Sequence, residues 1–135
     1  MTDRFADTFY FLALSNPHDA AHASARRFAV EPNVRLVTTA WVLTEVGDAH
    51  AAPMNRAAFL RLYRQLANHS AVEIVPPEPS LFDRAIDLFE RRPDKGWSLT
   101  DCISFVVMTD RGLTEALTGD HHFEQAGFRA LLRNG

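Results

Sequence analysis

The sequence predicts an α/β protein built on a parallel β-sheet, and three observations support this. Short apolar runs alternate with longer segments of helical periodicity, the pattern of strands joined by crossover helices. The chain has 135 residues, close to the usual size of one domain, and shows no internal repeat. Its composition, 47% hydrophobic and 23% charged, is that of a globular chain. We therefore expect residues 1–135 to form one domain.

Five short runs are predicted to be strands because they are apolar and are bounded by turn-forming residues. They cover residues 4–8, 35–38, 72–75, 115–118 and 128–132. Gly119 and Gly127 mark turns after the fourth run and before the fifth. The proline-rich segment 76–79 is too short for a domain linker and indicates a loop.

Five segments are predicted to be helices, at residues 20–29, 40–50, 55–68, 79–92 and 99–109. Thr39 is the expected N-cap of the second segment. The fifth segment is ambiguous, because its apolar run could also form a buried strand. We predict a helix there because Ser98 and Asp101 form a capping box just before the run, and Gly112 follows as the stop.

Four acidic residues are expected to meet at one edge of the sheet, where parallel strands end and sites usually form. Asp7 ends the first predicted strand, and Asp120 directly follows the fourth. Glu45 lies in the helix that leaves the second strand, and Asp101 lies in the first turn of the helix before the fourth. Clustered carboxylates repel one another unless a hard cation such as Mg²⁺ neutralises them. Two such ions can hydrolyse a phosphodiester, so the pattern predicts metal-dependent phosphodiester chemistry.

Four stretches of the chain resemble a known family when taken together. They are residues 5–11 (FADTFYF), 38–46 (TTAWVLTEV), 98–102 (SLTDC) and 116–123 (ALTGDHHF). In this order, and spanning nearly the whole chain, they resemble the PIN domain and, within that family, the small VapC-type toxin nucleases. The resemblance implies a five-stranded parallel sheet in the order 3-2-1-4-5, flanked by helices.

The resemblance also implies an activity, a set of site residues and partners. The implied activity is that of an endoribonuclease, in which a metal-activated water hydrolyses a phosphodiester of RNA. The implied Mg²⁺ or Mn²⁺ ligands are Asp7, Glu45, Asp101 and Asp120. Asp120 would act directly or through water, and Thr8 or Thr118 would help hold a water beside the metal. The implied partners are RNA, a second copy in a homodimer, and a small antitoxin protein.

Three of these acids also have a purely structural interpretation. Asp7 could cap a turn, Asp120 could be a turn residue, and Asp101 completes a capping box and could serve both purposes. The adjacent His121 and His122 invite a zinc-ligand or general-base interpretation, but no further Cys or His partner follows them in the loop. Surface or structural roles are therefore favoured for this pair.

Basic and aromatic residues before Asp101 provide a candidate contact with RNA. Arg91, Arg92 and Lys95 would form a phosphate track, the alternative being a solvated loop. Trp97 is close enough to Asp101 to stack on a base, the alternative being a core or rim aromatic. The net charge of −3 argues against binding of nucleic acid by global electrostatics, but not against a nuclease with acids at a metal site.

Two other functions compete with the ribonuclease prediction. A haloacid-dehalogenase-like phosphatase needs a second Asp two residues after the first, and Phe9 stands there instead. A non-catalytic PIN-like RNA-binding module is disfavoured because all four acids are present. The single cysteine, Cys102, cannot form an internal disulfide, and the chain shows neither a signal peptide nor a membrane-spanning run. A cytoplasmic protein without membrane contact is therefore expected.

Overall fold

The computed structural model describes residues 1–133, in which five strands alternate with seven helices. The strands are β1 (Thr2–Ala6), β2 (Val34–Thr39), β3 (Val72–Val75), β4 (Glu115–Leu117) and β5 (Arg129–Ala130). The helices are α1 (Thr8–Ser15), α2 (His22–Ala29), α3 (Ala40–Ala49), α4 (Pro53–Ala67), α5 (Pro79–Arg91), α6 (Leu99–Arg111) and α7 (His121–Gln125). Within these residues no helix combines the length and hydrophobicity that crossing a membrane would require.

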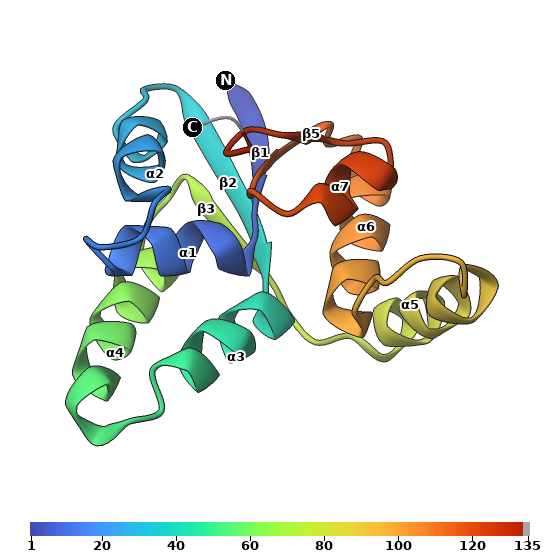
Figure 1. Cartoon of the computed structure of the whole chain (residues 1–135), viewed down its shortest axis with the longest axis horizontal. Helices are drawn as coiled ribbons and strands as arrows, with labels where there is room; N and C mark the ends of the chain where they lie inside the picture. Colours follow the sequence, from blue (N-terminus) through green and yellow to red (C-terminus); the bar gives the residue numbers. More distant parts are fainter. Residues whose placement is uncertain (134–135) are drawn as a thin grey trace.

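The strands form one parallel sheet in the order β3-β2-β1-β4-β5, as predicted. Figure 1 shows α1 to α4 on one side of this sheet and α5 to α7 on the other. The chain builds outward from β1 in one direction through β2 and β3, and then in the other through β4 and β5. The order therefore reverses between β1 and β4, which is where ligand sites form in open parallel sheets.

Helix α6 forms much of the core on the second side of the sheet. Its residues 101–108 are all buried, so the helix has no exposed face over this stretch. This explains why the segment resembles a buried strand in sequence. The ring of Phe105 packs edge-on against Phe123 of α7 and against Trp97, with centroids 4.9 and 5.0 Å apart. These contacts attach α7 to α6 and hold the loop after β4 close to the start of α6.

The prediction for the N-terminal segment was wrong in part. The first strand covers Thr2–Ala6 rather than residues 4–8, and a helix that the sequence did not predict, α1, begins at Thr8. Residues 8–15 are apolar on almost every side, so they show no amphipathic period that would identify a helix. The helix is held by burial of Tyr10, Phe11 and Ala13 rather than by a local signal.

The C-terminal third contains two further differences. His121 and His122 begin the short helix α7, whereas the sequence placed them in a loop. The fifth strand is confirmed but covers only Arg129–Ala130 instead of residues 128–132. Gly127 has a φ of 96°, a left-handed conformation that favours glycine, and it provides the turn between α7 and β5.

Candidate functional site

The register of β1 against β4 places Asp7 beside Thr118. Ala6 pairs with Leu117, so the next residue of each strand leaves the sheet at the same edge. The Thr118 hydroxyl donates to Oδ2 of Asp7 at 2.8 Å, and both side chains are buried. The same hydroxyl oxygen accepts the backbone N–H of Asp120 at 3.1 Å. Thr118 thus connects the acids that follow the two central strands.

The charge of Asp7 is strongly affected by its surroundings. Its pKa is raised from 3.8 to about 7, first because burial penalises the charged carboxylate. The hydrogen bond from Thr118 lowers the pKa, whereas the charges of Asp101 and Asp120 raise it. The negative charges of Asp101 and Asp120, which come from distant parts of the chain, therefore act on Asp7. A bound cation would reverse this effect by favouring the ionised form.

Asp101 is held by the capping box that the sequence predicted. Oγ of Ser98 accepts the Asp101 N–H at 3.0 Å, and Oδ2 of Asp101 accepts the Ser98 N–H at 3.1 Å. The same Oδ2 lies 3.0 Å from Nδ1 of His122. The carboxylate therefore both caps α6 and contacts the first turn of α7.

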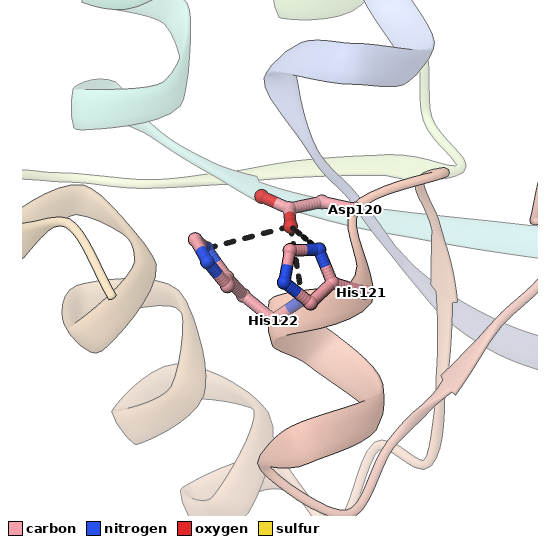
Figure 2. Close-up of side chains that lie close together, drawn as sticks. All are labelled: Asp120, His121 and His122. Carbon is pink, nitrogen blue, oxygen red and sulfur yellow. Dashed lines mark hydrogen bonds and ion pairs between the residues drawn. The ribbon is translucent and has the colours of Figure 1, made fainter. Parts of the chain in front are cut away.

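Asp120 caps the start of α7 and also faces both histidines that follow it. Its Oδ1 accepts the backbone N–H of His122 at 2.9 Å, as an N-cap does. The same oxygen lies 3.4 Å from Nδ1 of His122 and 3.6 Å from Nδ1 of His121 (Figure 2). His122 thus bridges Asp101 and Asp120. The sequence favoured a surface or structural role for His122 because no further Cys or His follows it, and its contact with Asp101 depends on how α7 packs against α6.

Glu45 is connected to the other acids through a hydrogen bond from Thr8. The Thr8 hydroxyl donates to Oε1 of Glu45 at 2.6 Å, which joins the first turn of α1 to α3. Thr8 directly follows Asp7, so the four predicted acids are linked through two threonines and one histidine. No direct hydrogen bond joins Glu45 to the other three acids within residues 1–133.

The donor set of this site fits a hard divalent cation. In the part of the chain that the structure describes, no lysine or arginine forms an ion pair with any of the four acids, and the only basic side chains beside them are those of His121 and His122. At the opposite end of the sheet, buried Arg4 forms ion pairs with both Glu31 and Glu115. At the β1–β4 edge, by contrast, the carboxylate oxygens converge without a lysine or arginine partner within residues 1–133. Mg²⁺ and Mn²⁺ prefer oxygen ligands of this kind.

The predicted basic residues lie between α5 and α6. Arg91 is exposed at the end of α5. Arg92 is paired with Asp94 through two hydrogen bonds of 3.0 Å, and Lys95 lies 3.9 Å from the same carboxylate. A single acid therefore partly neutralises this cluster, and Arg91 is left with its charge exposed.

Trp97 is a core side chain in this structure. It is only 6% exposed, and its indole N–H donates to Oε1 of Gln125 at 3.0 Å. Phe105 packs against the ring, and the guanidinium of Arg92 lies 5.1 Å from the ring centroid. The ring therefore packs against the Arg92 guanidinium, and too little of it is exposed to serve as a stacking platform for a base.

Comparisons with known proteins agree with this architecture. Residues 4–129 match the PIN domain. The 23S rRNA-specific endonuclease VapC20 of Mycobacterium tuberculosis is 31% identical over 130 residues, which cover 92% of this chain and 94% of that protein. The crystal structure of VapC20, described as a sarcin-ricin loop cleaving toxin, matches with a TM-score of 0.82 at 28% identity, covering 92% of this chain and 95% of that one.

A second solved structure supports the fold alone. FitAcB from Neisseria gonorrhoeae matches with a TM-score of 0.60 at 18% identity, covering 93% of this chain and 94% of that chain. The five-stranded order, the acids at the β1–β4 edge and the match over most of the chain agree with one another. The chain therefore belongs to the PIN-domain family, in which it resembles the VapC-type toxins.

Proposed function

We propose that this protein is a metal-dependent endoribonuclease that uses Mg²⁺ or Mn²⁺. The observation that carries the proposal is the convergence of Asp7, Asp101 and Asp120 at the β1–β4 switch point, with no lysine or arginine paired to them within residues 1–133. Glu45 completes the set through Thr8. The similarity to a 23S rRNA-specific endonuclease supports RNA as the substrate.

A divalent ion held by these carboxylates would activate a water for attack on phosphorus and stabilise the leaving oxygen. The roles of the protein's own residues follow from their contacts. Thr118 orients the Asp7 carboxylate, and the capping box fixes Asp101 at the start of α6. Thr8 holds Oε1 of Glu45 and so keeps this side chain from turning outward. Each acid is thus positioned before any ion binds, which reduces the cost of ordering the site.

The substrate path that we propose runs past the loop between α5 and α6. Arg91, Arg92 and Lys95 would bind phosphates there, and the salt dependence of RNA affinity would report their number. A groove of about 310 Å³ beside Arg91 and Arg92 is lined further by Thr109 and Gln125. An RNA carrying the sarcin-ricin loop is the first substrate to test, because the relative VapC20 is described as cleaving it.

The decisive experiment compares RNA cleavage by the parent protein with cleavage by Asp7→Asn and Asp101→Asn. Each change removes a charged ligand and keeps the shape of the side chain. We expect cleavage in Mg²⁺ or Mn²⁺, none in EDTA, and none in either variant. Asp3→Asn, an exposed acid on β1, is the matched control and should cleave like the parent. Full activity of both folded site variants would refute the proposal, and RNA binding without cleavage by the parent would favour the non-catalytic module.

We also propose a homodimer and a small antitoxin as protein partners. Two apolar surfaces are open to them. Phe82, Ile86 and Phe89 are exposed along one face of α5, and a groove of about 700 Å³ between α3 and α4 is lined by Phe59 and Tyr63. Light scattering across micromolar concentrations tests the dimer, and a strictly monomeric protein would contradict it.

We also propose that the protein works in the cytoplasm. A reducing cytoplasm suits buried Cys102, which is unpaired.

A further inference from the structure

Asp120, His121 and His122 gather three possible metal ligands at the rim of the four acids (Figure 2). One ligand atom from each residue lies within 4.8 Å of the other two. We propose that these three residues form a second cation site, which binds a borderline divalent ion such as Zn²⁺ rather than Mg²⁺. The proposal concerns a different ion, shares only Asp120 with the four acids of the ribonuclease site, and does not require the protein to cleave RNA.

The two nitrogen–oxygen distances in the cluster match the geometry that zinc requires, and the two histidine ligand atoms lie within 4.8 Å of each other. Nδ1 of His122 and Nδ1 of His121 lie 3.4 and 3.6 Å from the same oxygen, Oδ1 of Asp120. Ligands placed tetrahedrally at about 2.1 Å from an ion are separated by about 3.4 Å. An ion could therefore bind between these atoms with small rotations of the side chains. Three protein ligands would leave the fourth position open to water.

The two histidines differ in exposure in a way that suits ion entry. The side chain of His121 is 56% exposed, whereas that of His122 is 23% exposed and faces inward toward Asp101. The Asp120 carboxylate between them is fixed by the backbone N–H of His122. One ligand is thus exposed at the surface and two are held by the fold. An ion can reach the site from solvent without disturbing the core.

The chemistry of the ligands selects the class of ion. Imidazole nitrogen binds Zn²⁺, Ni²⁺ and Co²⁺ well, whereas Mg²⁺ prefers oxygen ligands and retains its waters. Nδ1 of His122 is shared with Asp101 at 3.0 Å, and an ion would take over this contact. Asp120 belongs to both sites, so an ion held by the histidines would compete with the carboxylate site for Asp120.

The test is a titration of the metal-stripped, full-length protein with Co²⁺ and Zn²⁺. Visible absorption reports whether Co²⁺ has a four-coordinate site with nitrogen ligands, and calorimetry gives the affinity for Zn²⁺. We expect one such site in the parent protein. His121→Gln and the double variant His121→Gln/His122→Gln should weaken Zn²⁺ binding by at least about tenfold, because each removes a ligand. Since His121 is largely exposed, its replacement should leave the fold intact.

Two matched variants decide between this site and its alternatives. His18→Gln removes an exposed histidine elsewhere and should bind both ions like the parent. Asp7→Asn alters the carboxylate site and should retain the Co²⁺ absorption. Unchanged Zn²⁺ affinity in the histidine variants would overturn the proposal. So would loss of the Co²⁺ absorption in Asp7→Asn alone, because the ion would then occupy the carboxylate site. Neither result depends on RNA cleavage, so the zinc site can be refuted without refuting the ribonuclease proposal, and the reverse also holds.

Discussion

Replacing Asp7 with asparagine should make the metal-free protein more stable at neutral pH. The carboxylate is buried beside Thr118 and feels the charges of Asp101 and Asp120, and its pKa is raised to about 7. An asparagine side chain has nearly the same shape, and its carbonyl can still accept the Thr118 hydroxyl. The substitution therefore removes the buried charge and retains the hydrogen bond.

The magnitude follows from the pKa of the folded protein. The pKa of Asp7 rises from 3.8 to about 7 on folding, and at about 1.4 kcal/mol per pKa unit this amounts to about 4 kcal/mol. Below about pH 4 the carboxyl is protonated in both the folded and the unfolded chain, so it has no effect there. As the pH rises from about 4 to 7, the unfolded chain loses this proton first and the free energy of unfolding falls. Above about pH 7 the full loss in free energy of unfolding, about 4 kcal/mol, is present.

Urea unfolding in EDTA at pH 4 to 8 measures this effect directly. The difference in free energy of unfolding between Asp7→Asn and the parent should grow from near zero at pH 4 to about 4 kcal/mol at pH 8. Asp3→Asn controls for the loss of an acid from the same strand and should follow the parent. Parallel pH profiles for the parent and Asp7→Asn would refute the reasoning, because Asp7 would then ionise alike in both states. Mg²⁺ at a hundred times its dissociation constant should restore about 2.7 kcal/mol to the parent and to Asp3→Asn, but not to Asp7→Asn.

Three further predictions concern the same edge of the sheet. Thr118→Val removes the hydroxyl that lowers the pKa of Asp7, so the pH-dependent loss of stability should extend to higher pH in the same urea series; an unchanged profile would argue against this bond. Ser98→Ala should cost about 1 kcal/mol and lower the melting temperature by roughly 3–5 °C, measured by circular dichroism, whereas no loss would mean that the cap is unimportant. Gly119→Ala should cost about 1 kcal/mol in urea unfolding, because its Cβ would lie 2.4 Å from the ring of Phe9. Adding Phe9→Ala should recover that loss, and a failure to do so would place the strain elsewhere.

Local patterns were sufficient to predict much of the fold. The N-cap at Thr39, the capping box of Ser98 and Asp101, and the left-handed Gly112 at the end of α6 all lie where the sequence placed them. Such signals involve residues within a few positions of one another, so tertiary context seldom changes them. Helix α1 was missed for the opposite reason. Its residues are apolar on nearly all sides, and only burial against α2 and α3 makes the segment a helix.

The sequence by itself determined which acids stand at strand ends and at the start of α6, because alternating strands and helices with their caps are local features. Only the tertiary structure decided how these acids are joined. The hydrogen bond from Thr118 to Asp7 spans 111 residues and depends on the register of β4 against β1. The contact of His122 with Asp101 spans 21 residues and depends on the packing of α7 against α6. Register and packing are set by the burial of the whole core, and no short pattern in the chain encodes them.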